Sequence, residues 1–361
     1  MGIPLRVLPS GLTPQALRAR PSGLAPLSPQ GTPLRREGPH TQSLSTKMDS
    51  AAFVETRPTL VASLRSVTTK LLERQQPPLP SRRVAATSYF PHIVHQTWRT
   101  HELPLGLRRL SKTWQKHLPR WKYRLHTDQD NLELVQKHYS WLLSAYRRFS
   151  AIQRADTARY LYMHAFGGVY ADLDVELLQP LRSLLRAQRH LNVSVILGQE
   201  PLAHALLLER RPRQVCNAVL ASVRGHPFWF DVLKRVASGA AHADPVSSTG
   251  PRMLEQALSA WNATSGHQHR YGGIVVVAPD VFFPTWDPMQ ADTFRQRCGT
   301  RGQDGGSTVG SGELKHAIEG MCAKLRADGF QPTVPKDGSA YTNHLWSHTW
   351  IPGAEKRSVI D

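Results

Sequence analysis

The chain has 361 residues, enough for one large domain or two small ones. Its 45 Lys and Arg against 27 Asp and Glu give a formal net charge of +18, which attracts anions such as sugar nucleotides, anionic lipid headgroups and nucleic acid. Its three cysteines exclude a small disulfide-dense scaffold, and the sequence contains no zinc knuckle or RNP-like motif that would favour nucleic-acid binding.

The first 87 residues differ in composition from the rest. Prolines recur throughout residues 1–48 and prevent a continuous helix, so this part is predicted to be a disordered Pro- and Arg-rich tail that partly resembles an organelle transit peptide. Residues 49–87 are predicted to form one helix and a linker, and the helix would pack on the domain or lie on a membrane. No run of about 18 apolar residues occurs, so no membrane span is predicted, although membrane association remains open.

From Phe90 onward, alternating strand and helix patterns predict an α/β domain. In chain order the predicted elements are strand 92–98, helix 105–117, strand 121–126, helices 130–139, 142–149 and 151–164, strand 169–175, strand 193–198, helices 214–223, 228–237 and 252–261, and strand 274–278. Residues 299–312 are rich in Gly and Ser and are predicted to be an irregular insertion.

The most informative segment is residues 167–174, Gly-Gly-Val-Tyr-Ala-Asp-Leu-Asp. If residues 169–175 form one strand, Asp172 and Asp174 point to the same face, because side chains alternate along a strand. Two hard oxygen ligands on one face suit Mg²⁺ or Mn²⁺, ions that commonly complete their shell with substrate phosphates. The glycine pair allows a tight turn and close approach of a ligand to the backbone. An isolated Asp-x-Asp is more often a pair of solvated turn residues than a metal site. The neighbouring residues are therefore needed to distinguish the two interpretations.

The predicted helix 151–164 leads directly into this segment. Asp156 and Arg159 are three residues apart and therefore neighbours on the helix surface. They form either an intrahelical ion pair or a pair that binds sugar hydroxyls, with Asp accepting and Arg donating.

Five blocks along the chain resemble one enzyme family. They are residues 90–98 (Phe-Pro-His-Ile-Val-His-Gln-Thr-Trp), 154–176, 217–229 (ending His-Pro-Phe-Trp), 249–251 (Thr-Gly-Pro) and 341–350 (Tyr-Thr-Asn-His-Leu-Trp-Ser-His-Thr-Trp). In this order they resemble the glycosyltransferase family 32 sugar-transferases, which include yeast-type α-mannosyltransferases and the mannosyltransferases acting on inositol phosphoceramide. Co-occurrence of five blocks is far more specific than any one of them.

The resemblance implies a GT-A fold over residues 88–352, followed by a short tail, 353–361. This fold is a Rossmann-like nucleotide-sugar-binding domain with a mixed, mostly parallel central sheet flanked by helices. The resemblance also implies Mn²⁺ (or Mg²⁺) as cofactor. Its implied metal ligands are Asp172, Asp174 and His344; the catalytic residues are Asp172, Asp174 and Arg159; and the donor-binding residues are Thr97, Trp98, Arg154, Asp156, Arg159, Gly168, Tyr170 and Trp350.

Two of these assignments, Trp98 and His344, have an ordinary structural alternative. Trp98 either stacks on the nucleotide base or belongs to the core. His344 either completes the metal shell or is structural, and His348, four residues on, is a neighbour rather than a ligand.

The function implied by the resemblance is metal-dependent, retaining transfer of a hexose, first mannose from GDP-mannose, to a glycan or glycolipid hydroxyl such as that of inositol phosphoceramide. UDP-galactose or UDP-N-acetylglucosamine transfer is the alternative within the fold. A metal phosphoesterase and a non-catalytic nucleotide-sugar-binding protein are the alternatives of other classes. Retention favours a front-face displacement, because no carboxylate stands out as a nucleophile; Glu200 and Asp280 are candidates for that role or for the acceptor site.

Family members are often anchored in the Golgi, so the resemblance implies this or another endomembrane compartment, with a cytoplasmic or organellar location as the alternative. Cys298 and Cys322 would pair in an oxidising compartment, whereas Cys216, in a predicted helix, would be a buried apolar residue. Asn192 and Asn262 begin Asn-x-Ser/Thr glycosylation signals, which favour the secretory route weakly.

Overall fold

The computed structural model describes residues 89–239, 244–264, 266–299 and 312–349. The predicted tail 1–48 and the predicted helix and linker 49–87 lie outside the described residues. The same holds for most of the insertion 299–312, for Trp350 and for the tail 353–361.

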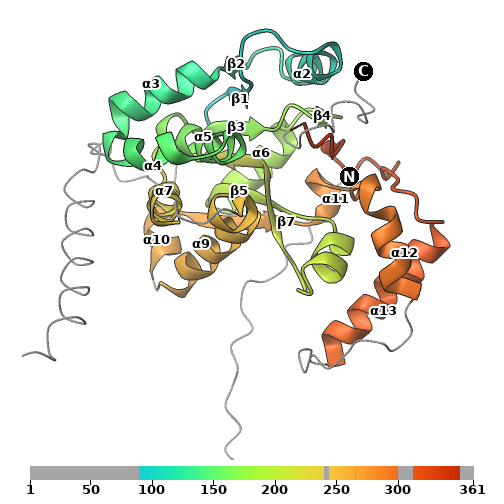
Figure 1. The fold of residues 1–361 in the computed structure, drawn as a ribbon. Coiled ribbons are helices and arrows are strands. Elements are labelled where there is room, and N and C mark those ends of the chain that lie inside the picture. Colours follow the sequence, from blue (N-terminus) through green and yellow to red (C-terminus); the bar gives the residue numbers. More distant parts are fainter. Residues whose placement is uncertain (1–88, 240–243, 265, 300–311, 350–361) are drawn as a thin grey trace, which may run out of the picture. The chain divides into compact units, whose positions relative to one another are not determined.

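A six-stranded sheet in the order β2-β1-β3-β6-β5-β7 forms the centre of the domain (Figure 1). Its strands are β1 (Ile93–Thr97), β2 (Lys122–His126), β3 (Gly168–Ala171), β5 (Val193–Gln199), β6 (Val215–Ser222) and β7 (Gly273–Val277). Strand β1 is parallel to β2 and β3, and β5 is parallel to β7, whereas β6 is antiparallel to both β3 and β5. The predicted fold class is therefore confirmed: α/β, with the mixed, mostly parallel sheet that the resemblance to GT-A enzymes implied.

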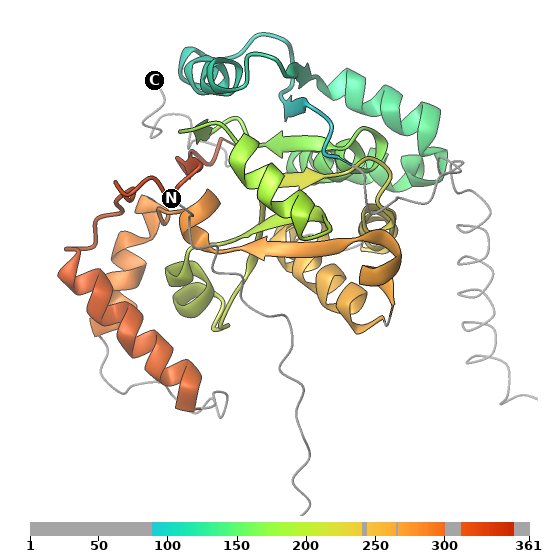
Figure 2. The same cartoon turned by 180° about the vertical axis from the view of Figure 1, so that it is seen from behind.

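Helices cover both faces of this sheet (Figures 1 and 2). On one face, α5 (Ala151–Ala165), α7 (Pro227–Ser238) and α9 (Pro251–Ala263) enclose one apolar cluster. On the other face, α2 (Leu105–His117), α6 (Arg182–His190) and α11 (Pro279–Phe282) border a second cluster. The remaining described helices are α3 (Asp128–His138), η1 (Ser140–Leu142), α4 (Leu143–Arg148), η2 (His204–Leu208), α8 (Pro245–Ser248), α10 (His267–Tyr271), η3 (Pro288–Gln290), α12 (Ala291–Gly299) and α13 (Gly312–Ala327).

The link between α5 and β3 places the Asp-x-Asp segment. Helix α5 begins with a capping box formed by Ser150 and Gln153, which satisfies backbone N–H groups that its first turn leaves free. The chain then turns through Gly167 and Gly168, which have φ of 63° and 92°. A Cβ on Gly168 would lie 2.5 Å from the carbonyl oxygen of Ile93, so the close approach that requires a glycine here is that of strand β1.

Strand β6 corrects the predicted helix 214–223, which was wrong. All eight residues Val215–Ser222 are buried, because helices cover the sheet on both sides. A strand buried on both faces shows a continuous apolar run without two-residue alternation, and such a run is not distinguishable from a buried helix by periodicity. Cys216, predicted to be a buried apolar residue, is buried, but on this strand.

The predicted single strand 169–175 was also wrong. Strand β3 ends at Ala171, and Asp172 to Asp174 form a turn in which the Val175 N–H donates to the Asp172 carbonyl at 3.1 Å. The chain leaves the main sheet here because β4 (Val175–Leu177) pairs antiparallel with β8 (Thr342–His344) in a separate two-stranded sheet. The two aspartates are therefore turn residues between two sheets.

Most other predicted elements are confirmed, and the predicted helix 105–117 has the bounds of α2. Cys298 at the end of α12 and Cys322 on α13 form a disulfide with a Cα–Cα distance of 5.4 Å. Around it lies a third apolar cluster that includes Trp286 and Phe294. Within the described ranges, no helix combines the length and the apolar character needed to cross a membrane.

Candidate active site

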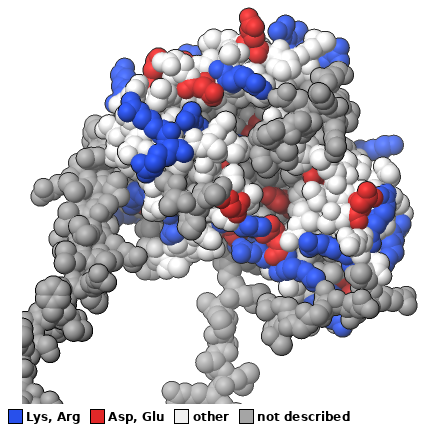
Figure 3. Space-filling view, viewed as in Figure 1, with Lys and Arg blue, Asp and Glu red and all other residues white. Residues whose placement is uncertain are grey.

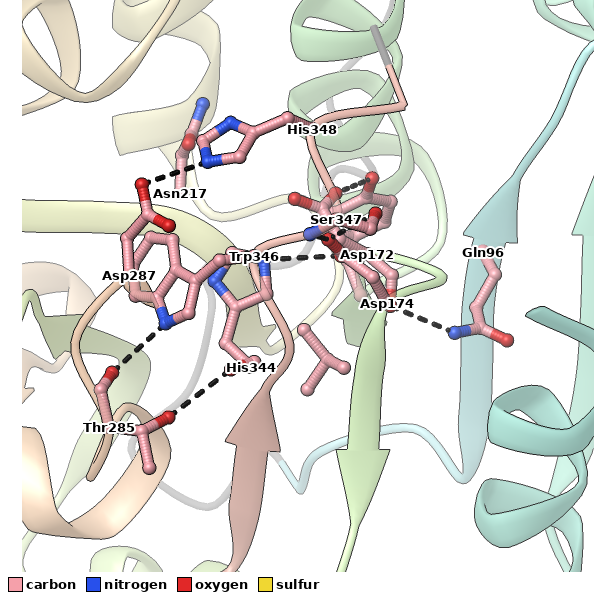
Figure 4. A network of polar contacts seen from close by, with 12 residues as sticks. Gln96, Asp172, Asp174, Asn217, Thr285, Asp287, His344, Trp346, Ser347 and His348 are labelled. Carbon is pink, nitrogen blue, oxygen red and sulfur yellow. Dashed lines mark hydrogen bonds and ion pairs between the residues drawn. The ribbon is translucent and has the colours of Figure 1, made fainter. Parts of the chain in front are cut away.

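Three side chains that could bind a metal ion meet where the β3–β4 turn faces the end of β8 (Figure 4). Asp172, Asp174 and His344 each offer one ligand atom, and these atoms all lie within 4.8 Å of one another. The pairing of β4 with β8 brings them together, since Val175 lies opposite His344 in the register. The structure thus brings together the three residues predicted as metal ligands.

The carboxylate of Asp174 is held by the C-terminal segment. His344 Nε2 donates to Oδ1 at 3.1 Å, and the backbone N–H and hydroxyl of Ser347 donate to Oδ2 at 2.9 and 2.8 Å. Burial alone would raise the pKa of Asp174, but the charge of His344 and these hydrogen bonds bring it below its ordinary value. Burial likewise would lower the pKa of His344, but the carboxylates of Asp174, Asp172 and Glu200 raise it. Asp174 and His344 therefore form an ion pair.

Asp172 is held from the helix side of the turn. Tyr170 donates its hydroxyl to Oδ1 at 2.5 Å, and Arg159 approaches Oδ1 and Oδ2 at 3.2 and 3.4 Å. Gln96 on β1 donates to the backbone carbonyl of Asp172 at 3.1 Å. The pKa of Asp172 is raised, first by burial, which outweighs the opposing charge of Arg159, and further by the charge of Asp174. With 22% of its side chain exposed, against 13% for Asp174, Asp172 is the more accessible carboxylate.

Asp156 and Arg159 form a buried ion pair directly behind Asp172. They are 5% and 4% exposed, and Nη2 of Arg159 lies 3.2 Å from Oδ1 of Asp156. Asp156 also accepts hydrogen bonds from Thr249 at 2.8 Å and from Asn217 at 3.0 Å, and Arg159 donates to the Asn217 carbonyl at 2.9 Å. The intrahelical ion pair is therefore present, and Arg159 also contacts Asp172. Direct contact of Asp156 and Arg159 with the donor stays a prediction.

The donor set of this cluster fits a divalent cation. Two carboxylates and one imidazole are ligands that Mn²⁺ accepts, and Mg²⁺ prefers the carboxylates. Nδ1 of His344 is buried and has no hydrogen-bond partner in the part of the chain that the structure describes. A buried polar atom without a partner is uncommon in a native structure and is often explained by an ion or a water.

The predicted nucleotide-binding residues lie next to the Asp-x-Asp turn. Thr97, at the end of β1, donates its hydroxyl to the His126 carbonyl at 3.1 Å and accepts from Asn131 at 3.0 Å. Trp98 is half-buried and packs against a small apolar cluster that includes Leu173, the residue between the two aspartates. Its ring also carries the guanidinium of Arg99, 4.8 Å from the centroid.

The other predicted site residues occupy different positions. Arg154 is on the exposed side of α5 and donates to the Arg147 carbonyl at 3.2 Å. Tyr170 is buried and reaches Asp172, as described above, and Gly168 faces β1. His348 contacts Asp287 at 2.9 Å rather than the metal-ligand cluster.

The residues that hold the aspartates were not assigned roles from the sequence. They are Gln96, Asn217, Thr249 and Ser347. All four lie within the sequence blocks that resemble family 32, so the blocks contained the signal. The blocks do not indicate which group each of these four residues contacts by a hydrogen bond.

On the face shown in Figure 3, acidic side chains lie in the hollow at the centre, and basic side chains gather around it. A hollow lined by carboxylates attracts cations, and the basic surroundings attract an anionic ligand such as a diphosphate.

Comparison with known proteins identifies the segment that carries this site. Residues 104–191, which include both aspartates and Arg159, match the model of the glycosyltransferase sugar-binding region containing a DXD motif. The chain is 31% identical over 200 residues to inositol phosphoceramide mannosyltransferase 3 of Schizosaccharomyces pombe, covering 53% of this chain and 51% of that protein. It is 30% identical over 174 residues to mannosyl phosphorylinositol ceramide synthase SUR1 of Saccharomyces cerevisiae, covering 45% of this chain and 40% of that protein.

The chain thus spans about half the length, or less, of these two relatives. Among solved structures, the PaToxG glycosyltransferase aligns over 74% of this chain and 95% of its own, with 14% identity and a TM-score of 0.38, a likeness too weak to inform the chemistry. The family model and the curated relatives agree with one another and with the residues of the site. The segment that holds both aspartates therefore matches the glycosyltransferase sugar-binding region with a DXD motif, and the chain is similar to mannosyltransferases of inositol phosphoceramide, in agreement with its resemblance to family 32.

Proposed function

We propose that the chain is a metal-dependent retaining glycosyltransferase. Its donor would be a nucleotide-activated hexose, first GDP-mannose, and its acceptor a glycan or glycolipid hydroxyl such as that of inositol phosphoceramide. The observation that carries the proposal is the convergence of Asp172, Asp174 and His344, two of which lie within the family-matched segment. The choice of mannose and of a glycolipid is supported by the names of the relatives, which are mannosyltransferases of inositol phosphoceramide.

Each residue of the site would have a distinct role in the reaction. A divalent ion held by Asp172, Asp174 and His344 would supply positive charge against the donor diphosphate. Arg159 and Tyr170 orient Asp172, and Ser347 orients Asp174, so each carboxylate is fixed before the donor arrives. Such prior orientation lowers the cost of stabilising charge on the leaving group.

The nucleotide would lie over the end of β1. Trp98 offers a half-buried aromatic face beside Leu173, and a base stacked there would bring its diphosphate towards the Asp-x-Asp turn. Thr97 fixes the end of this strand through its contacts with His126 and Asn131.

We further propose an oxidising endomembrane compartment such as the Golgi. The Cys298–Cys322 disulfide supports this location, because disulfides persist in oxidising compartments and are rare in the cytosol.

The test is turnover of sugar nucleotides by the purified full chain. With Mn²⁺ and inositol phosphoceramide, we expect GDP-mannose to be consumed in preference to UDP-galactose and UDP-N-acetylglucosamine. Asp174→Asn should lower turnover by about 100-fold or more while the fold is retained. Asp292→Asn, which changes an exposed aspartate on α12, is the matched control and should remain active. Equal turnover in excess chelator would contradict the metal-dependent mechanism.

A further inference from the structure

Glu200 lies at the same edge of the central sheet as Asp172. Strand β3 ends opposite Val219, in the middle of β6, and strand β5 ends with Gln199 opposite Val215, the first residue of β6, so both strands run towards the beginning of β6. The backbone N–H of Glu200 then donates to the Gln214 carbonyl at 2.8 Å, which fixes the chain just beyond this edge.

A buried histidine faces the carboxylate of Glu200. Nδ1 of His204 lies 3.6 Å from Oε2 of Glu200, and His204 itself is 5% exposed. Its other ring nitrogen, Nε2, accepts a hydrogen bond from the backbone N–H of Asp287 at 3.0 Å. A neutral imidazole that accepts at Nε2 carries its proton at Nδ1, so the N–H of His204 points towards Glu200.

This pair is connected to the metal-ligand cluster by aromatic contacts. The ring of His204 lies 4.7 Å from that of Trp346, and the ring of Trp346 lies 4.0 Å from that of His344. Trp346 is itself fixed by a hydrogen bond from its indole N–H to the Thr285 carbonyl at 3.0 Å (Figure 4). Glu200 is also one of the three carboxylates whose charge acts on His344.

The local backbone supports a functional role. His204 begins the π-helical segment η2, and π-helical turns are rare and occur frequently at functional sites. The Glu200 side chain is 13% exposed, the same fraction as that of Asp174, so it is accessible to a ligand without being freely solvated. None of the hydrogen bonds that orient Asp172 and Asp174 involves Glu200.

We propose that Glu200 is the acceptor-side carboxylate of this site and that His204 is the positioning residue that orients it. The proposal rests on the glycosyltransferase function proposed above and assigns the incoming hydroxyl a partner. The carboxylate of Glu200 would accept a hydrogen bond from the acceptor hydroxyl and fix its approach to the anomeric carbon.

The bonds in this step balance without a covalent enzyme intermediate. The bond from the anomeric carbon to the diphosphate oxygen breaks, and a bond from that carbon to the acceptor oxygen forms. The hydroxyl proton passes to the departing diphosphate, so the step transfers no proton to Glu200. A nucleophile for double displacement would have to face the side of the sugar opposite the leaving group. Glu200 forms no covalent bond with the sugar in the step described above, so it needs no such position.

The experiment compares transfer with donor binding in the full chain. In Glu200→Gln, we expect kcat for transfer to fall by about tenfold or more, with acceptor KM raised, because a neutral amide oxygen accepts the hydrogen bond of the hydroxyl less strongly than a carboxylate oxygen does. Binding of GDP-mannose with Mn²⁺, measured by calorimetry, should stay within about threefold of the wild-type value. Glu133→Gln, which changes an exposed glutamate on α3, is the matched control and should alter neither quantity. If Glu200→Gln fails to fold, Glu200→Asp, which keeps the charge but withdraws the carboxylate, is compared by the same two measurements.

The role of His204 is tested by a pair of substitutions. His204→Asn keeps an N–H donor near the position of Nδ1, whereas His204→Leu fills the space without a donor. A positioning role predicts a tenfold or larger loss of kcat in His204→Leu and a substantial recovery in His204→Asn, with donor affinity unchanged in both. Equal kcat in the two variants would show that His204 serves only to pack against Trp346.

The experiments distinguish a failure of the role proposed for Glu200 from a failure of the proposed glycosyltransferase function. Normal transfer by Glu200→Gln would overturn the inference and leave the proposed function standing. A glycosyl adduct on Glu200, found by mass spectrometry, would also overturn it, because the residue would then be a nucleophile. A wild-type chain that neither binds nor turns over any sugar nucleotide would overturn both proposals.

Discussion

His344 and Asp174 form a hydrogen-bonded ion pair across a separation of 170 positions in the sequence. The contact exists because strands β4 and β8 pair so that Val175 lies opposite His344. The C-terminal segment then continues over the same carboxylate and places the N–H and hydroxyl of Ser347 on its second oxygen. The site is therefore complete only when β8, the last described strand, has paired with β4, the strand that follows the Asp-x-Asp turn.

This arrangement predicts graded losses of Mn²⁺ affinity. His344→Ala removes a proposed ligand and should weaken Mn²⁺ binding by about 100-fold, whereas Ser347→Ala removes only an orienting contact and should weaken it by about tenfold. Calorimetric titration of the full chain with Mn²⁺ measures both. The exposed-site variant Asp292→Asn should bind as the wild type does. Unchanged affinity in His344→Ala would remove this residue from the ligand set.

Arg159 is predicted to be essential for stability as well as for the site. Its guanidinium compensates two carboxylates, Asp156 and Asp172, in surroundings where it is 4% exposed. Arg159→Leu leaves both without their partner and should lower the free energy of unfolding by about 3–5 kcal/mol, measured in urea.

Arg154, one turn earlier on α5, is the matched control for this measurement. It is exposed and bonds only a backbone carbonyl among the contacts seen here, so Arg154→Leu should change the free energy of unfolding by about 0.5 kcal/mol or less. Similar effects of the two substitutions would show that the buried ion pairs contribute little.

The α/β class followed from local patterns and the proposed ligand residues from the resemblance to family 32, whereas neither source predicted how these residues are arranged. Helix α2 buries residues at helical spacing, such as Leu107, Ser111 and Trp114, and Pro104 precedes it, so its position was predictable. Strand β6 was taken for a helix because helices cover it on both faces, and its apolar residues are consecutive as a result.

The Asp-x-Asp segment shows a different limit of local reasoning. Asp172 and Asp174 were expected to share a face of one strand, but the strand ends at Ala171 and the chain crosses to a second sheet. That crossing depends on β8, more than 160 residues later, and nothing within residues 167–175 indicates it. The ligands nevertheless converge, because the turn and the strand pairing fix them together.

Gly168 is predicted to tolerate no side chain. Its φ of 92° disfavours any L-residue, and a Cβ would meet the Ile93 carbonyl oxygen at 2.5 Å, so Gly168→Ala forces β1 and β3 apart. We expect a loss of about 2 kcal/mol or more in the free energy of unfolding, measured in urea. Gly320→Ala is the control: Gly320 lies within α13 with nothing near its missing Cβ, so alanine there should stabilise by about 0.5–1 kcal/mol. A stable Gly168→Ala variant would show that the two strands can shift without penalty.

Stability without metal is predicted to fall as the pH drops below 6.5, because several buried histidines stay neutral in the folded chain. Burial lowers the pKa from 6.5 to about 3 in His95 and His226 and to about 4 in His126 and His164. As the pH falls, a histidine whose pKa is lowered in the folded chain is protonated first in the unfolded chain. Its contribution to the free energy of unfolding is therefore complete above pH 6.5 and is lost between pH 6.5 and the pKa of the folded state. Each such histidine should lower the free energy of unfolding by about 2 kcal/mol at pH 5 relative to pH 7.5.

His344 acts in the opposite direction. Its pKa is raised in the folded chain, so its contribution is present below pH 6.5 and is lost as the pH rises through the folded value, which offsets part of the loss from the four neutral histidines. Urea unfolding in chelator at pH 7.5, 6.5 and 5 measures the balance. His164→Gln removes one buried neutral imidazole and should reduce the fall in stability between pH 7.5 and 5 by about 2 kcal/mol, whereas the exposed-site variant His138→Gln should leave the fall unchanged. An equal fall in His164→Gln and the wild type would mean that this imidazole is protonated in the folded chain, which its burial and its contact with Tyr139 at 2.8 Å argue against.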